Sequence, residues 1–278
     1  MMTAIRTTAL LVVLVAIVAL PAMAQTPRMD ATGYGFAAVS VDETASFNNP
    51  AGLPLLDTFG TRISPWPSRA SLNFLADGPD DLSQMSAFYA GRAADNANGW
   101  GVGYIGSENG FDSDDYSLGY GQQVGNGLTV GASVFYQTWD APMLTEQNGN
   151  DDSATSFDLG AIYRREMALN AWRFGLWVED VADEYGGPLF HVGAAVELPA
   201  GVQVGATLYD LTDEFDSWVG IGAEWAVPMS PAVVRVGSAD GELSAGAGWR
   251  FQNFEINAAW TEVDGGDDMI TAGATGCF

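Results

Sequence analysis

The stretch Leu243-Ser244-Ala245-Gly246-Ala247-Gly248-Trp249-Arg250-Phe251 alternates strictly between two kinds of residue. Its odd positions are apolar or aromatic, and its even positions are small or polar. Side chains of a β-strand point alternately to opposite faces, so this period predicts a strand with one apolar face and one polar or glycine face. Residues 202–208 and 254–260 repeat the pattern.

About 14 such segments follow one another from Ser68 to the end of the chain. Each is close to the roughly 9–11 residues that cross a bilayer at a tilt, and an even number suits a closed barrel. A soluble β-sandwich also alternates, but it buries its apolar faces in one core and rarely needs so many strands. We therefore predict an all-β fold, a transmembrane antiparallel up-and-down β-barrel over residues 68–278. The expected strands lie near residues 68–76, 84–92, 98–106, 115–123, 127–138, 154–164, 171–179, 188–198, 201–209, 217–227, 232–239, 242–251, 253–262 and 269–278.

Aromatic residues gather near the ends of these segments on the apolar face, as in the aromatic girdles of barrels in lipid. The chain ends in Phe278, on the same register as Ile270, Ala272 and Ala274. A terminal aromatic residue of this kind resembles the assembly signal of outer-membrane proteins. We therefore expect outer-membrane lipid and the barrel-assembly machinery as partners. The aromatic residues concerned are Trp100, Tyr104, Tyr116, Tyr120, Tyr136, Tyr163, Trp172, Trp225, Trp249 and Trp260.

The connections between segments alternate in length. Short links such as residues 124–127, 198–201 and 251–253 follow even-numbered segments, whereas most odd-numbered segments precede longer acidic stretches. Outer-membrane barrels have short periplasmic turns and longer outer loops. This arrangement predicts a protein of the bacterial outer membrane with both termini in the periplasm.

The first 24 residues have the features of a secretory signal peptide. A lone Arg6 precedes an apolar run over residues 9–20, and Ala22-Met23-Ala24 forms a small-x-small cleavage site. A signal anchor is the alternative, but the run is short beside the roughly 20 residues that a spanning helix needs. We expect cleavage before Gln25.

Charge is strongly unbalanced along the chain. The 10 basic residues are all arginine and face 35 acidic residues, which gives a net charge of -25. Nucleic-acid binding requires a basic surface, so this class of partner is excluded. The acidic loops serve as a solvated surface, as ligands for divalent cations that bridge to anionic lipid, or as a mouth that repels anions, and none has the spacing of a defined calcium site. Cys277 is the only cysteine, so no internal disulfide forms.

Two motifs resemble nucleotide-binding loops without their context. Residues 101–106 match GxGxxG and residues 33–38 match GxGxxA, but neither lies between a strand and a helix in a βαβ unit. We expect the glycines on the inward face to leave room for something inside the barrel. A single histidine, His191, cannot form a multi-histidine metal site, and no GxSxG signature is present. We therefore predict no enzyme activity, no cofactor and no metal.

Charged residues also occupy the face opposite the apolar one, which lines the lumen. Buried charges need partners or water, so we expect arginine–carboxylate ladders inside the barrel, with a role in gating or solute passage as the alternative. Arg173 and Arg235 are the expected anchors for a segment folded inside. The predicted lumen-facing residues are Asp158, Arg164, Arg173, Glu179, His191, Glu197, Glu224, Arg235, Arg250 and Glu255.

Residues 25–67 lack the period of the strands and are interrupted by glycine and proline. The segment is either a disordered tail or a folded plug. Its apolar and aromatic residues, among them Tyr34, Phe36 and Phe47, need burial, which favours a plug. A barrel of this width also needs its interior filled. We therefore predict a hatch in the lumen.

Residues 33–53, which read GYGFAAVSVDETASFNNPAGL, resemble the opening of the FadL/PorV-type (OmpP1/FadL/TodX-like) outer-membrane barrels. Those proteins begin with a glycine-rich stretch and an Asn-Pro-Ala-Gly turn before the first strand. The resemblance implies an N-terminal hatch, and we expect Asn49, Pro50 and Gly52 to turn the chain from the plug to the first strand at the inner wall. The matching hatch motif is Asp42, Ala45, Asn49, Pro50, Ala51 and Gly52.

The resemblance implies one of two activities. In the fatty-acid transporter branch, the barrel passes hydrophobic molecules, and we expect FadL-like transport of small hydrophobic or amphipathic solutes gated by the hatch. In the other branch, a PorV-like barrel holds a secreted protein for a secretion or surface-attachment system. A third alternative is a structural barrel that transports nothing.

Overall fold

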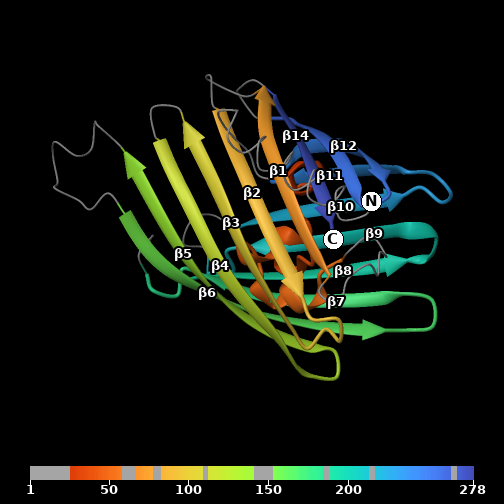
Figure 1. Ribbon diagram of the computed structural model, residues 1–278, viewed down its shortest axis with the longest axis horizontal. Coiled ribbons are helices and arrows are strands. Elements are labelled where there is room, and N and C mark those ends of the chain that lie inside the picture. Colours follow the sequence, from red (N-terminus) through yellow and green to blue (C-terminus); the bar gives the residue numbers. More distant parts are fainter. Residues whose placement is uncertain are drawn as a thin grey trace, which may run out of the picture.

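The computed structural model describes residues 26–57, 67–77, 83–108, 112–140, 153–183, 188–212, 217–263 and 268–278. Its strands form one closed antiparallel barrel in which each strand pairs with its neighbours along the chain and β1 pairs with β14 (Figure 1). The predicted barrel of 14 strands is confirmed. The predicted signal peptide, residues 1–24, lies outside the described residues.

The strands lie where the period of two places them, and their ends differ from the predicted ones by at most a few residues. They are β1 (Ser68–Asp77), β2 (Ser83–Arg92), β3 (Asn98–Glu108), β4 (Asp112–Gly125), β5 (Leu128–Asp140), β6 (Ser153–Glu166), β7 (Ala171–Glu179), β8 (Leu189–Leu198), β9 (Val202–Tyr209), β10 (Trp218–Ala226), β11 (Ala232–Ala239), β12 (Glu242–Phe251), β13 (Phe254–Thr261) and β14 (Met269–Cys277).

The two ends of the barrel differ in their connections. Links after even-numbered strands are short and include residues 126–127, 199–201 and 252–253. We call this side the short-turn end and the opposite side the long-loop end, although the β3–β4 and β11–β12 links there are also short. The barrel closes at the short-turn end, where the backbones of Ser68 and Phe278 exchange two hydrogen bonds of 2.9 and 3.2 Å. The first strand therefore begins, and the chain ends, on the same side.

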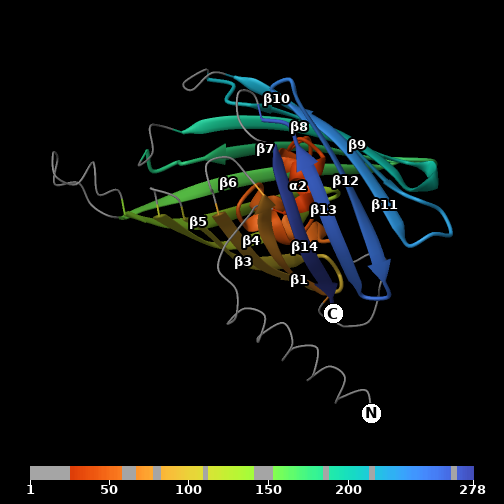
Figure 2. The ribbon, with the colours of Figure 1, turned by 90° about the horizontal axis from the view of Figure 1, so that it is seen from above.

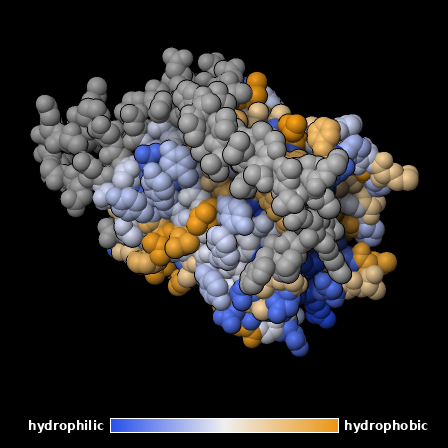
Figure 3. Space-filling model, viewed as in Figure 1, coloured by the Kyte–Doolittle hydropathy of each residue, from blue (hydrophilic) through white to orange (hydrophobic). Residues whose placement is uncertain are grey.

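The outer face of the barrel carries the apolar residues. Leu118, Ile221 and Ile256 are each more than half exposed, and they alternate along their strands with residues that face the lumen. Figure 3 shows apolar side chains in patches on the outside of the barrel. Exposed apolar surface of this extent is typical of contact with lipid. In the described part of the chain, no helix is long and apolar enough to cross a bilayer.

Inside the barrel lies a stretch that we call the luminal segment, Thr26–Asp57. It contains one helix, α2 (Pro27–Ala31), and three short 3-10 helices, η1 (Ala37–Val39), η2 (Glu43–Ser46) and η3 (Pro50–Leu55). Figure 2 shows this segment enclosed by the strands. Most of its residues are buried, including Ala38, Ala45 and Leu53 at 0% exposure. The three aromatic residues whose need for burial favoured a plug, Tyr34, Phe36 and Phe47, are partly buried against the barrel wall, beside Trp218, Gly205 and Phe88.

Candidate functional site

The luminal segment crosses the whole interior of the barrel. Helix α2 contacts β11 to β14, η1 contacts β7 to β9, and η2 and η3 contact β1 to β6. The gap at β10 is filled by Gly33 and Gly35, whose backbone lies against Gly220 and Gly222. The segment therefore reaches every strand of the wall.

Glycines of the wall allow this close approach. A Cβ at any of twelve lumen-facing glycines would come within 3.0 Å of an atom of the luminal segment. At Gly175 the obstructing atom is the backbone oxygen of Ala38, and at Gly222 it is that of Thr32. Backbone atoms cannot swing aside like side-chain ends, so only glycine fits at these two positions. We call the set the glycine ring: Gly99, Gly101, Gly103, Gly121, Gly131, Gly160, Gly175, Gly205, Gly220, Gly222, Gly237 and Gly246.

The glycine ring explains the GxGxxG match at residues 101–106. Gly101 and Gly103 lie in β3 and face Leu53 and Phe47 of the luminal segment. Gly106 lies beside the ring of Tyr104. The motif is part of a strand, and its inward glycines leave room for the luminal segment.

The predicted hatch-motif residues hold the luminal segment together. Asp42 caps η2 by accepting hydrogen bonds from the Thr44 backbone N–H (3.0 Å) and hydroxyl (2.5 Å). Asn49 caps η3 through the Ala51 N–H (3.1 Å), and its side-chain amide donates to the backbone oxygens of Ala38 (2.7 Å) and Leu176 (3.0 Å). Asn49 thus bonds to both the segment and the wall.

The remaining motif residues pack without polar contacts of their side chains. Ala45 joins Leu53, Leu56 and Ala90 in an apolar cluster, and Pro50 and Ala51 are buried in η3. A side chain at Gly52 would collide with the backbone oxygen of Ser40. The motif therefore sets the internal packing of the luminal segment.

Asn49, Pro50 and Gly52 do not form the expected turn into the first strand. They belong to the start of η3. Helix η3 lies against β2 to β6, and its main contacts are with β4, β5 and β6. Asn49 approaches Gly160 of β6, across the lumen from the start of β1. The motif docks inside the barrel because its proline and asparagine begin a 3-10 helix there.

A charge network joins the luminal segment to the wall. Arg28 bonds to Asp42 within the segment (3.1 Å) and to Glu224 of β10 (3.0 Å). Arg235 of β11 bonds to Glu224 (2.7 Å) and to Glu255 of β13 (2.5 Å). Arg250 also contacts Glu255 (2.5 Å) and Glu224 (3.9 Å), so three arginines face three carboxylates. This balanced network is the ladder that the lumen register predicts.

The expected anchors, Arg173 and Arg235, act differently. Arg235 reaches the luminal segment only through the shared carboxylate of Glu224. Arg173 pairs with Glu197 (3.5 Å) and donates to Gln203 (3.1 Å), both of which belong to the wall. The arginines that join the luminal segment to the wall directly are Arg28, Arg69 of β1, which pairs with Glu43 of η2 (2.6 Å), and Arg92 of β2, whose Nε donates to the Leu56 backbone oxygen (2.9 Å).

Burial changes the proton affinity of acids in the luminal segment, which is not one of the membrane-crossing strands. Burial alone would raise the pKa of Asp42, but Arg28 and Arg69 outweigh it and hold that pKa below its usual value. At Asp30, burial dominates and raises the pKa to about 6, against the opposing effect of the Tyr34 hydroxyl, which donates a 3.1 Å hydrogen bond. The ionised Asp42 is therefore part of the network with Arg28.

The remaining predicted lumen residues form two smaller groups. Arg164 bonds to Glu197 (3.5 Å), next to Arg173 at the short-turn end. Toward the long-loop end, Asp158 accepts from the Asp180 backbone N–H (3.1 Å), and His191 contacts Glu179 (3.1 Å). The ten predicted residues thus lie in three separate groups.

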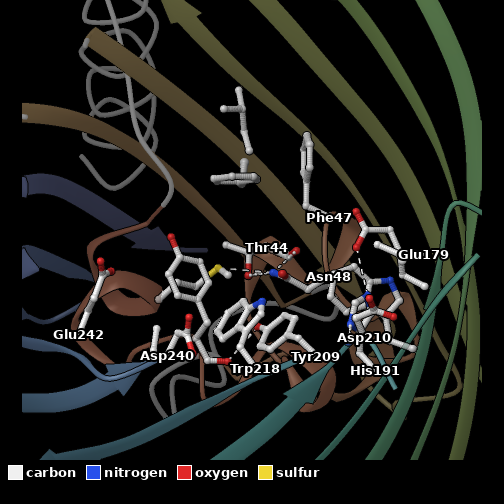
Figure 4. A pocket seen from close by; sticks show the side chains of 17 residues that line it. Thr44, Phe47, Asn48, Glu179, His191, Tyr209, Asp210, Trp218, Asp240 and Glu242 are labelled. Atoms are coloured by element: carbon white, nitrogen blue, oxygen red, sulfur yellow. Dashed lines mark hydrogen bonds and ion pairs between the residues drawn. The ribbon is translucent and has the colours of Figure 1, made fainter. Parts of the chain in front are cut away.

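A cavity of about 620 Å³ lies between the luminal segment and the long-loop end. Met29, Thr44, Phe47 and Asn48 of the segment form its floor. The wall contributes aromatic residues and carboxylates, which Figure 4 shows around the space. These wall residues are Phe88, Trp177, Glu179, His191, Tyr209, Asp210, Trp218, Asp240 and Glu242. In the described part of the chain, no cluster of three or more potential metal ligands is present.

Sequence analysis assigned only Glu179 and His191 of this cavity. The rings of Tyr209 and Trp218 stack with centroids 3.8 Å apart and an interplanar angle of 5°. The Tyr209 hydroxyl donates a hydrogen bond to the backbone oxygen of Tyr34 (3.1 Å). Both aromatic residues lie at the ends of their strands, where aromatic residues are also expected in an outer girdle. Strict alternation puts Tyr209 on the other face of its strand from Leu208, and Arg69 on the other face from Ala70. Since Leu208 and Ala70 belong to the apolar outer face, the register predicts that the Tyr209 and Arg69 side chains face the lumen.

Three solved structures share this architecture. The toluene transporter TbuX of Ralstonia pickettii matches with a TM-score of 0.61 and 13% sequence identity, over 91% of this chain and 98% of that chain. The CymD monoaromatic hydrocarbon channel matches with a TM-score of 0.56 and 12% identity, over 91% and 97% of the two chains. The chain has the FadL-type outer-membrane barrel fold.

A Pseudomonas aeruginosa FadL homologue has the same FadL-type fold, with a TM-score of 0.52 and 12% identity over 93% of this chain and 98% of that chain. No family model and no curated protein matches the sequence. The similarity to known proteins is therefore one of fold, the FadL-type barrel.

Proposed function

We propose that this FadL-type barrel takes up small hydrophobic or amphipathic solutes at the bacterial outer membrane, and that the luminal segment is its hatch. The observation that carries the proposal is the cavity of about 620 Å³ that borders a luminal segment in contact with every strand of the wall. Its volume lies within the range of about 300–1,000 Å³ that is usual for small-molecule sites. The toluene transporter and the monoaromatic hydrocarbon channel with this fold are consistent with such solutes.

In this proposal the short-turn end faces the periplasm, so that solutes enter from the long-loop end. Phe278 at the short-turn end is the proposed contact with the barrel-assembly machinery. The chain binds and releases its solute without catalysis. Passage requires the luminal segment to shift, because in the position described it contacts every side of the wall.

Filling the cavity should block uptake. Ile105 of β3 lines the cavity, so Ile105→Trp should lower uptake of 2-phenylethanol and benzyltrimethylammonium several-fold. The assay uses radiolabelled solutes and cells that lack their own channels for hydrophobic solutes. Val102→Trp is the matched control, since Val102 is 39% exposed on the outer face of the same strand.

Two results would contradict the proposed function. The first is uptake of both solutes at the same rate in cells with the wild-type barrel and in cells without it. The second is an Ile105→Trp variant that reaches the membrane in normal amount and takes up solute at the wild-type rate. A protein-holding barrel would give the first result and would instead yield an abundant cross-linked protein partner in intact cells.

A further inference from the structure

The cavity has two chemically different sides. Phe47, Phe88 and Ile105 form an apolar side, and Phe47 packs edge-on against Phe88 with ring centroids 5.5 Å apart. The opposite side, formed from β7 to β12, combines aromatic rings with carboxylates. A ligand that fills the space would meet apolar surface at one end and negative charge at the other.

Four carboxylates line the second side: Glu179 at the end of β7, Asp210 after β9, Asp240 in the β11–β12 turn and Glu242 at the start of β12. In Figure 4 they lie in two pairs, with Tyr209 and Trp218 between them. Glu179 has a side chain that is 44% exposed, and Asp240 is exposed as well. These two carboxylates are therefore open to an arriving ligand.

Positive charge is kept away from this cavity. No arginine is among the described residues that line it. Arg69, Arg92, Arg164 and Arg250 instead lie near the short-turn ends of their strands, and Arg28 and Arg235 are paired with carboxylates of the charge network. A concave site lined with one sign of charge concentrates ions of the opposite sign. The cavity should therefore attract cations and repel anions.

His191 does not supply a positive charge to the cavity. Its Nδ1 accepts a hydrogen bond from the backbone N–H of Asp210 (3.2 Å), so the ring proton lies on Nε2 and is donated to Glu179 (3.1 Å). The ring is therefore neutral in this arrangement. It stacks near Trp177, with centroids 4.4 Å apart, and continues into the rings of Tyr209 and Trp218.

Aromatic rings beside carboxylates are the usual surroundings of bound ammonium groups, because the ring face attracts a cation and tolerates its alkyl groups. We propose that the solute of this barrel is an organic cation: an apolar body that lies against Phe47, Phe88 and Ile105, with an ammonium group among the aromatic rings and carboxylates. This inference rests on the proposed function and adds the charge of the solute.

Calorimetric titration of the full-length protein in detergent tests the charge preference. Three probes of similar size are compared: benzyltrimethylammonium, which is cationic, 2-phenylethanol, which is neutral, and phenylacetate, which is anionic. We expect the cation to bind with a dissociation constant roughly tenfold below that of the neutral probe, which corresponds to one cation–π contact with partial charge pairing. Phenylacetate should show no binding.

The double variant Glu179→Gln/Glu242→Gln should bring the cation and the neutral probe to within about threefold of each other, since its amides keep hydrogen bonding but remove two charges. Glu166→Gln/Glu262→Gln removes the same charge at positions away from the cavity lining and should keep the wild-type preference. Equal affinity of the wild type for the cation and the neutral probe would overturn the inference and leave the proposed function intact. An unchanged preference in Glu179→Gln/Glu242→Gln would overturn it as well. The proposed function fails separately, through the uptake assay.

Discussion

Replacing Gly175 with valine should release the luminal segment from the wall and raise the single-channel conductance of the barrel several-fold. The added side chain would collide with the backbone oxygen of Ala38 in η1. Strand β7 is paired on both sides with β6 and β8, so the wall cannot move back. Overpacking of this kind costs about 1–3 kcal/mol. Here the cost destabilises the contact between Gly175 and Ala38, which holds the luminal segment against β7.

Gly125→Val is the matched control for this substitution. A Cβ at Gly125 meets no atom within 4 Å, and the residue lies at the end of β4, away from the luminal segment. Its conductance should equal that of the wild type. If the Gly175→Val barrel folds and conducts no more than the control, the glycine ring does not hold the luminal segment in its position against the wall.

Replacing Arg235 with methionine should lower the free energy of unfolding by about 3–5 kcal/mol, because it leaves one uncompensated negative charge in a buried network. Arg235 is 1% exposed and contacts Glu224, Glu255 and Asn257. Its removal leaves three carboxylates facing two arginines in the network. Urea titration in detergent measures the loss.

A second substitution should restore part of this stability. In Arg235→Met/Glu255→Gln the network again has equal numbers of arginines and carboxylates, so we expect the double variant to be more stable than Arg235→Met. Arg165→Met, at an exposed position on β6, should leave stability close to that of the wild type. If Arg235→Met is as stable as Arg165→Met, the charge network does not hold the barrel interior together.

The barrel could be predicted from the sequence because a period of two is a local signal. Each strand of an outer-membrane barrel repeats it, and a residue such as Glu255 is assigned to the lumen by its neighbours Phe254 and Ile256 alone. The ten lumen residues follow from this register. The ion-pair partners of these residues do not follow from the register. Arg235 of β11 pairs with Glu255 of β13, and the two strands are separated by β12.

The path of the luminal segment could not be predicted. A five-residue α-helix and three 3-10 helices have no long period, so nothing in the local pattern places Arg28 beside Glu224. The path is determined by shape, since the segment runs where inward glycines such as Gly175 and Gly222 open the wall. The cavity above it depends on the same path, because Phe47 and Asn48 form its floor.

The division of charge by the luminal segment connects the structure to the proposed transport. Arginine lies mainly on the short-turn side, and the cavity on the long-loop side is lined with carboxylates. Near the segment the arginines are paired with carboxylates, three with three in the charge network. Movement of the segment would have to rearrange the contacts of Arg28 with Asp42 and Glu224 at the same time.

The most direct test of the account is the conductance of a barrel without the luminal segment. Residues 26–57 are deleted from the chain, and the variant is reconstituted in planar bilayers once circular dichroism and heat-modifiable migration show that the barrel has formed. We predict large, continuously open channels for the deletion and almost no conductance for the wild type, because the segment contacts every strand of the wall. A formed barrel with the same conductance as the wild type would contradict the central claim that the luminal segment closes the lumen.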